Sequence, residues 1–241
     1  MHGTHQSGDL VLDFIAPSVF SEQTIGIHSP DTLLLSEPNT SWLYAISKRS
    51  LDICGALIGL TLFSLLFPVI ALLILWEDHG PIFYKQTRIG RYGRPFTIYK
   101  LRSMISNADA YLAQHPQLLE AWQQKGKLHS DPRITRIGGF LRRSSIDELP
   151  QLFNVLRGEM SLVGPRAIQL SELNAFGELS ELRQMVKPGL TGLWQVSGRS
   201  TTDYEQRCIL DCTYVMECSL QMDIHILLKT LPVVFYRTGA Y

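Results

Sequence analysis

The 241-residue sequence contains little cysteine and little charge. Four cysteines are too few for a small secreted scaffold that is held together by disulfide bonds. Charged side chains make up only 18% of the residues, whereas soluble domains average about 25%. Because 45% of the residues are apolar, the composition excludes a disordered chain, a histone-like polycation and a collagen-like fibre.

Several short functional motifs are also absent, since the sequence contains no HExxH, CxxC, GxGxxG or GxxxxGK[ST] pattern. Cys208 and Cys212 are spaced for one face of a helix, but no histidine lies at zinc-finger spacing from them. We interpret these cysteines as reduced core thiols, with a zinc site as the alternative. Reduced thiols are typical of a domain exposed to the cytosol.

The formal charge is zero, but the charges are distributed unevenly. Residues 1–47 carry five acidic residues and no lysine or arginine, which predicts an acidic, flexible tail. The window 81–103 carries six basic residues and no acidic one: Lys85, Arg88, Arg91, Arg94, Lys100 and Arg102. Such a cluster favours phosphate esters, lipid headgroups or nucleic acid as partners, and a solvated basic surface is the alternative.

One segment has the length and composition of a membrane helix. Ile53–Leu75 contains no charged side chain. As a helix this segment is about 34 Å long, enough for a hydrocarbon core of about 30 Å. Pro68 removes a backbone donor inside the segment and predicts a kink or a break. The flanking charges fit both a simple span and a re-entrant hairpin with its two ends in the cytoplasm, so both topologies stay open.

The rest of the sequence predicts an α+β fold that is mainly helical. Ile82–Gln86 and Phe96–Tyr99 are β-prone runs around a basic loop with two glycines, and they predict a short β-hairpin. Apolar periodicity predicts the helices, and glycine and proline mark the connections. The expected helices are Ser106–Gln124, Leu149–Leu156, Asp203–Glu217 and Met222–Tyr236, the last interrupted by Pro232, and Lys187–Ser200 is expected to form a loop.

An adjacent pair of acids, Asp147 and Glu148, lies in the stretch RRSSIDELPQ at 142–151. Ser145 and Glu148 have the spacing of a capping box, which explains both acids as residues that start a helix. The alternative is catalytic. Carboxylates at the positive end of a helix, beside two arginines, are expected to stay ionised next to a natural phosphate site. There one carboxylate serves as a nucleophile and the other as a Mg²⁺ ligand.

Arginines beside glycine supply candidate phosphate ligands. Arg166 follows Gly164-Pro165, and Arg199 follows Gly198. An arginine on a loop bracketed by glycine suits bidentate phosphate binding, because the backbone approaches the anion closely. A surface salt bridge is the alternative for each of them. Lys100, from the basic window, is a further candidate for binding phosphate.

Longer motifs follow one another in a fixed order. They are KRSLDICGALIG at 48–59, GPIFYKQTRIGRYGRPFTIYKLRSM at 80–104, DPRITRIGGFLRRSSIDELPQLFNVLRGEMSLVGPR at 131–166, KPGLTGLWQVSGRS at 187–200 and TGAY at 238–241. This set resembles the bacterial sugar transferases, the monotopic phosphoglycosyl transferases that start glycan assembly on a polyprenyl carrier. The resemblance runs from about Lys48 to Tyr241, and an ordered set of this length is far more specific than any short motif.

The resemblance implies that the chain moves a sugar-1-phosphate from a UDP-sugar to undecaprenyl phosphate and releases UMP, as the first membrane step of exopolysaccharide synthesis. It implies that Asp147 is a nucleophile that forms a covalent phospho-sugar intermediate, and that Glu148 helps to hold Mg²⁺. The hydrophobic helix of this family re-enters the membrane, which implies that Pro68 is the break. The implied phosphate ligands are Arg142, Arg166 and Arg199.

These inferences divide the chain into three parts. They are a tail at 1–47, a membrane-inserted, re-entrant helix at 48–78 and a catalytic domain at 79–241, which is expected on the cytoplasmic face of a bacterial inner membrane. Glucose or galactose is the expected sugar, as for a short exopolysaccharide-type member. The sequence departs from the family pattern at Phe67, Ala167 and Ser200.

Two other functions stay open. One is a membrane-anchored basic module that binds anionic lipid or nucleic acid without catalysis, although nothing among the basic residues resembles a base-stacking platform. The other is a membrane-bound phosphatase that forms an aspartyl-phosphate and needs no lipid acceptor.

Overall fold

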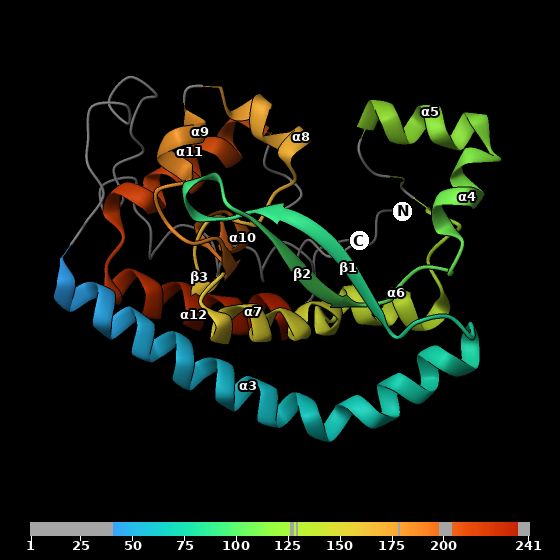
Figure 1. The fold of residues 1–241 in the computed structure, drawn as a ribbon, viewed down its shortest axis with the longest axis horizontal. Helices are drawn as coiled ribbons and strands as arrows, with labels where there is room; N and C mark the ends of the chain where they lie inside the picture. The colour runs from blue at the N-terminus through green and yellow to red at the C-terminus, as the bar shows by residue number, and fades with distance from the viewer. Residues whose placement is uncertain (1–40, 126–127, 129, 178, 198–203, 236–241) are drawn as a thin grey trace, which may run out of the picture.

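A computed structural model describes residues 41–125, 128, 130–177, 179–197 and 204–235 of the protein (Figure 1). The predicted acidic tail at 1–47 therefore lies almost entirely outside the described residues. The described part is mainly helical with a short antiparallel strand pair, which confirms the predicted α+β class. Figure 1 shows one long helix, α3 (Trp42–Glu77), running beneath the other elements.

Helix α3 begins well before the predicted apolar segment, and its length and composition are sufficient to cross a membrane. Gly55 and Gly59 bring it close to the domain above. A Cβ atom on them would lie 2.5 Å from Leu162 Cδ1 and 2.7 Å from Leu152 Cδ1, so a side chain there would require these leucines or the helix to shift. Elsewhere α3 leaves large apolar side chains exposed, including Ile58, Leu62, Leu65, Val69, Leu72 and Trp76.

Pro68 lies inside α3 and does not end it. A proline in a helix removes one backbone hydrogen bond and typically bends the axis. Figure 1 shows that α3 changes direction along its length, so the helix is bent but continuous. The neighbouring Phe67 ring stacks on Phe83 with a centroid distance of 5.5 Å, which ties this part of α3 to the first strand.

Both ends of α3 contact the same folded domain. Near the start, Asp52 is 2% exposed and accepts hydrogen bonds from Ser161 Oγ and from the backbone N–H of Leu162, both at 2.8 Å. At the other end, the Glu77 carboxylate accepts the first two backbone N–H groups of α6 (Arg136–Arg143) at 2.6 and 2.9 Å. Between these two points the buried face of α3 stays packed on the domain through Ala56, Phe63 and Ile70.

Strands β1 (Phe83–Ile89) and β2 (Pro95–Leu101) form the predicted antiparallel hairpin, closed by the turn η1 (Arg91–Gly93). Strand side chains alternate between two faces. Gln86 and Arg88 consequently share one face of β1. Lys100 pairs with Tyr84 across the ladder, so its side chain lies on that face too.

The helix expected over Ser106–Gln124 is divided into α4 (Ala108–Ala113) and α5 (Pro116–Lys125). Proline is well tolerated in the first turn of a helix, where an amide hydrogen has no partner, and poorly tolerated further inside. Pro116 therefore starts a new helix and prevents α4 from continuing. Figure 1 places α4 and α5 at one end of the molecule, away from helices α8, α9 and α11.

After α6 the chain passes through η2 (Ile146–Gln151), a 3₁₀ turn, into α7 (Leu152–Arg157). The predicted capping box is wrong. Ser145 has a φ of 56°, in the left-handed region, and its side chain makes no capping hydrogen bond. The helix expected from Leu149 accordingly begins only at Leu152.

The segment Lys187–Ser200, expected to be a loop, contains β4 (Gly189–Thr191) and α10 (Leu193–Val196). Strand β4 pairs in parallel with β3 (Ser161–Val163), and this pairing joins residues far apart in the chain. Three short helices lie between the two strands: α8 (Leu170–Leu173), η3 (Asn174–Phe176) and α9 (Leu179–Arg183).

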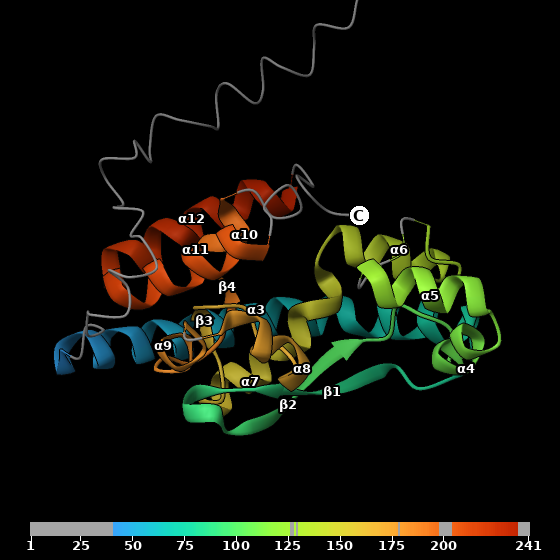
Figure 2. The same cartoon turned by 90° about the horizontal axis from the view of Figure 1, so that it is seen from above.

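Helices α11 (Tyr204–Glu217) and α12 (Leu220–Phe235) complete the described domain, and Pro232 lies inside α12 without interrupting it. Figure 2 shows helices α10–α12 on one side of α3 and the hairpin on the other. Free thiols at Cys208, Cys212 and Cys218 are buried, as interpreted from the sequence. The main core joins helices and strands from the whole domain through Ala56, Ile98, Val155, Val163, Leu193, Tyr214 and Ile226.

Candidate active site

An open cavity of about 1930 Å³ lies between the hairpin, the α4–α5 arm, helix α6 and the helices near the C-terminus. Its wall contains the five candidate site residues that the structure describes: Lys100, Arg142, Asp147, Glu148 and Arg166. They come from a strand, a helix, a 3₁₀ turn and a loop, so only the tertiary fold brings them together. The sixth candidate, Arg199, lies outside the described residues.

The acid pair sits on η2, just after the left-handed Ser145. A single left-handed residue redirects the chain within one position. Asp147 is only 7% exposed, whereas the Glu148 side chain is 21% exposed. The two carboxylates therefore have different environments although they are adjacent in sequence.

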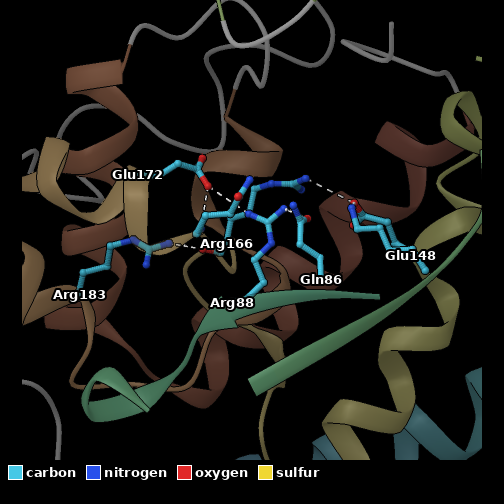
Figure 3. Close-up of polar contacts among 8 residues, drawn as sticks. Gln86, Arg88, Glu148, Arg166, Glu172 and Arg183 are labelled. Atoms are coloured by element: carbon cyan, nitrogen blue, oxygen red, sulfur yellow. Dashed lines mark hydrogen bonds and ion pairs between the residues drawn. The ribbon is translucent and has the colours of Figure 1, made fainter. Parts of the chain in front are cut away.

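Glu148 is held by two cations. Lys100 Nζ lies 2.8 Å from Glu148 Oε1, and Arg166 Nη2 lies 3.4 Å from the same oxygen. Figure 3 shows Arg166 reaching across the cavity wall to Glu148. Burial raises the pKa of Glu148, but the charges of Lys100 and Arg166 outweigh burial and lower the pKa to about 2. Glu148 is thus an anion at any physiological pH.

Asp147 shows the opposite shift. Burial, followed by the negative charge of Glu148, raises the pKa of Asp147 to about 6, against the lowering effects of Lys100, Arg142 and Arg166. The sequence predicted that neighbouring cations keep both acids ionised at neutral pH, and for Asp147 burial outweighs these cations and raises the pKa. At pH 7 the group is still mainly ionised, in the state that a nucleophile requires.

Arg142 projects from α6 toward Asp147, and its Nε donates a hydrogen bond of 2.8 Å to Ser103 Oγ. Burial lowers the pKa of Arg142, while the charges of Asp147 and Asp131 act in the opposite direction. Helix α6 reaches this position because Gly138 lies directly against the backbone of Ser103, where a Cβ atom would overlap the carbonyl group.

Sequence reasoning did not single out Arg88 as a site residue. Its guanidinium lies in the same cavity wall, 3.1 Å from Glu172 Oε2 and 2.6 Å from Gln86 Oε1 (Figure 3). The signal that could have identified it is alternation along β1, which places Gln86 and Arg88 on one face, together with Lys100 from β2. Arg88 adds a third cation beside Lys100 and Arg166.

The described residues contain no group of three or more His, Cys, Asp or Glu side chains that could hold a metal ion. The carboxylates that line this cavity are those of Asp109, Asp131, Asp147 and Glu148, and Asp147 and Glu148 form the adjacent pair among them. A lone pair of carboxylates is a common arrangement for Mg²⁺, which completes its shell with substrate phosphates and water. Zinc, the alternative for the cysteines, has no ligand set in this part of the chain.

Comparison with known proteins identifies matching sequences over most of the chain. The sequence model described as "Bacterial sugar transferase" matches residues 43–237. The chain is 47% identical over 200 residues to the UDP-galactose-lipid carrier transferase of Erwinia amylovora. This match covers 80% of this chain and 41% of that protein.

Two further relatives differ in length. The undecaprenyl-phosphate galactose phosphotransferase of Salmonella typhimurium is 46% identical over 202 residues, covering 80% of this chain and 41% of that protein. The exopolysaccharide production protein ExoY of Sinorhizobium fredii is 43% identical over 200 residues, covering 81% of this chain and 88% of that protein. The chain thus spans less than half the length of the two galactose-named relatives and most of the length of ExoY.

Proposed function

The chain belongs to the bacterial sugar transferase family, and from this premise we propose that it transfers a sugar-1-phosphate from a UDP-sugar to undecaprenyl phosphate, releasing UMP. The observation that carries the proposal is the cavity wall in which Asp147 and Glu148 lie among Lys100, Arg142 and Arg166. Such a wall combines a carboxylate nucleophile with several ligands for phosphate oxygens. The reaction places the protein at the first membrane step of exopolysaccharide synthesis.

The names of two relatives suggest the sugar. Both the Erwinia amylovora and the Salmonella typhimurium proteins are named for galactose, so UDP-galactose is the first donor to test and UDP-glucose the second. The name of the Salmonella typhimurium relative specifies undecaprenyl phosphate, which supports this lipid as the proposed acceptor. Each of these substrates contributes negative charge that the basic cavity wall can offset.

In the first step an Asp147 carboxylate oxygen attacks the phosphorus that carries the sugar. A new bond forms between that oxygen and phosphorus, and the bond from phosphorus to the bridging oxygen breaks, so UMP leaves with the electron pair. Arg166 and Lys100, which hold Glu148 in the free protein, are placed to bind the phosphate oxygens as charge builds up. Arg142 contributes a further cation from the same cavity, where its charge acts on Asp147.

In the second step a phosphate oxygen of undecaprenyl phosphate attacks the same phosphorus. The bond to Asp147 breaks, which restores the carboxylate and yields an undecaprenyl diphosphate sugar. Two displacements at one phosphorus predict ping-pong kinetics. An Asp147 with a pKa of about 6 suits both steps, because it is ionised at neutral pH and yet leaves readily from phosphorus.

Glu148 is the residue that would hold Mg²⁺, because it is ionised, faces the cavity and lies beside Asp147. A bound Mg²⁺ offsets negative charge on the diphosphate during displacement. In this arrangement Lys100 and Arg166 transfer their contacts from Glu148 to the substrate phosphates.

We place α3 in the membrane as a re-entrant helix with both ends on one side. Its two ends contact the same domain through Asp52 and Glu77, which supports a hairpin-like path rather than a span. The bend at the level of the apolar stretch fits that path (Figure 1), and Pro68 is the residue in it that favours a bend. The catalytic domain then lies on the cytoplasmic face of the inner membrane, where UDP-sugars are made.

The experiment is a transfer assay in detergent with UDP-galactose, undecaprenyl phosphate and Mg²⁺. We expect UMP and a lipid-linked sugar to appear together in equal amounts. A phosphatase would instead release free sugar phosphate or inorganic phosphate without the lipid. A membrane-anchored binding module would release neither, and either result would reject the proposed reaction.

A further inference from the structure

The loop that carries Arg166 is fixed through its backbone. The Pro165 carbonyl accepts the N–H of Gly189 at 2.8 Å, and the Ile168 carbonyl accepts the N–H of Ile89 at 2.9 Å. The N–H of Gln169 donates to Glu172 Oε2 at 2.8 Å. Strands and a neighbouring helix thus hold the loop on either side of Arg166.

The backbone carbonyl of Arg166 itself accepts a hydrogen bond from a buried arginine side chain. Arg183, the last residue of α9, donates from Nη2 to the carbonyl oxygen of Arg166 (Figure 3). Arg183 is 4% exposed, and its guanidinium lies over the Phe176 ring at 4.7 Å. Its Nε donates to Asp211 Oδ2 on α11 at 3.1 Å, and the side chain of Asp211 is 1% exposed. A continuous chain of contacts therefore runs from α11 through α9 to the arginine that reaches Glu148.

Stability alone does not explain a buried ion pair. Removing two charges from water costs several kcal/mol per ion, so well-packed apolar side chains commonly stabilise a fold as well or better. An apolar pair at these positions would join α9 to α11 equally well. It would not supply a donor to the Arg166 carbonyl, which is the contact that the charged pair adds.

The carboxylate of Asp211 also offsets the positive charge of the arginines around it. Burial raises the pKa of Asp211, and the nearby guanidiniums of Arg183, Arg207 and Arg166 oppose that rise. Three arginines around one carboxylate would repel each other in its absence. The geometry thus links Asp211 to the placement of the substrate-facing Arg166 as well as to Arg183.

We propose that Arg183 and Asp211 are positioning residues, which fix the carbonyl of Arg166 and thereby aim its guanidinium at Glu148 and the substrate phosphates. The proposal rests on the proposed function, in which Arg166 binds the donor. Neither residue touches the reacting atoms. Their effect is exerted through Arg166, in the way that supporting hydrogen bonds orient functional side chains elsewhere.

Kinetics of Arg183→Met test this role, with Lys48→Met as the matched control. Lys48 also forms a buried ion pair, 2.9 Å from Asp223, whose side chain is 0% exposed, but neither residue lines the cavity. We expect Arg183→Met to raise the KM for UDP-galactose about tenfold with a smaller change in kcat. Arg183→Lys should recover part of the loss, and Lys48→Met should leave KM unchanged. A KM for Arg183→Met equal to that of Lys48→Met would overturn the proposal.

A double-mutant cycle separates positioning from a general loss of structure. If Arg183 acts through Arg166, adding Arg183→Met to Arg166→Lys changes KM by less than about twofold, because the two residues form one unit. Full additivity would mean that Arg183 acts independently of Arg166. If Arg183→Met does not fold, Asp211→Asn keeps the side-chain volume and takes its place in both experiments.

Amide hydrogen exchange provides a readout that does not need activity. We expect Arg183→Met or Asp211→Asn to accelerate exchange in the peptide 164–170 by about tenfold or more, while Lys48→Met does not. Unchanged exchange in that peptide would refute the positioning role. An inactive wild-type protein with the expected exchange pattern would instead reject the proposed reaction and leave the positioning of Arg166 established.

Discussion

Asp147 and Glu148 are adjacent on one 3₁₀ turn, yet their pKa values are shifted in opposite directions, to about 6 and about 2. Burial raises the pKa of both acids, and the difference arises because Lys100 and Arg166 contact Glu148 directly and not Asp147. Carboxylates whose environments separate their pKa values commonly have separate roles in catalysis. Here the separation supports the proposed roles, in which Asp147 is the nucleophile and Glu148 binds the cation.

Asp147→Asn should abolish transfer and at the same time stabilise the fold at neutral pH. The folded-state pKa of about 6 exceeds the ordinary value of 3.8, so the folded protein binds this proton more tightly than the unfolded chain does. Stability is therefore lost as the pH rises from about 4 to about 6, by up to about 3 kcal/mol at about 1.4 kcal/mol per pKa unit. Asparagine avoids this loss because it stays neutral.

Thermal unfolding in detergent and EDTA checks the sign of this effect. The Tm of Asp147→Asn should exceed that of the wild type at pH 7.5, and the two should converge near pH 4. A lower Tm at pH 7.5 would show that the ionised carboxylate is stabilised by its cationic neighbours more than it is penalised by burial.

Lys100→Met should weaken donor binding. Lys100 is the closest cation to Glu148 and a phosphate ligand in the proposed reaction, so its loss should raise the KM for UDP-galactose about tenfold or more. Lys85→Met is the matched control, because Lys85 is on the same hairpin but is exposed and outside the cavity wall. Equal effects of the two substitutions would argue against a specific role for Lys100.

Chelation of divalent cations should stop transfer without detaching the protein from lipid. Excess EDTA removes the cation that Glu148 is proposed to hold, whereas α3 binds through apolar contacts that do not depend on it. Transfer is followed by UMP release and membrane binding by vesicle flotation. Glu148→Gln should raise the Mg²⁺ concentration needed for half-maximal rate, and an unaltered Mg²⁺ dependence would remove Glu148 from that role.

Cysteine labelling should place both ends of α3 on the same side of the membrane. Ala45 and His79 are exposed and lie just outside the apolar stretch, so each is suitable for replacement by cysteine. The background is Cys54→Ser, because Cys54 is the exposed native thiol among the described cysteines. A membrane-impermeant maleimide should label Ala45→Cys and His79→Cys from the cytoplasmic side alone. Labelling from opposite sides would establish a spanning helix.

Local sequence signals predicted a large part of this structure. The β-prone runs identified the hairpin, because its strands are close in sequence and joined by a glycine-containing turn. The motif positions Lys100, Arg142, Asp147, Glu148 and Arg166 all reached one cavity. Local signals were less reliable where two of them compete, as at Pro116, which starts one helix and ends another.

Other features depend on contacts that no local pattern encodes. The pairing of β3 with β4 joins segments that are distant in the chain. For this reason the sequence predicted a loop where Gly189–Thr191 forms a strand. The spacing of Ser145 and Glu148 favoured a capping box, but Ser145 adopts a left-handed conformation instead. The chain turns at this residue, and η2 then packs against β2. The Arg183–Asp211 pair follows no motif and becomes visible only when α9 and α11 are packed together.

The central claim is that Asp147 carries the sugar phosphate between donor and lipid. The most direct test incubates the protein with UDP-galactose, and in parallel with UDP-glucose, without undecaprenyl phosphate, and then maps the peptides by mass spectrometry. We expect a hexose-phosphate adduct on Asp147, one UMP released per adduct, and no adduct in Asp147→Asn. UMP release that requires the lipid acceptor, with no adduct on Asp147, would contradict it.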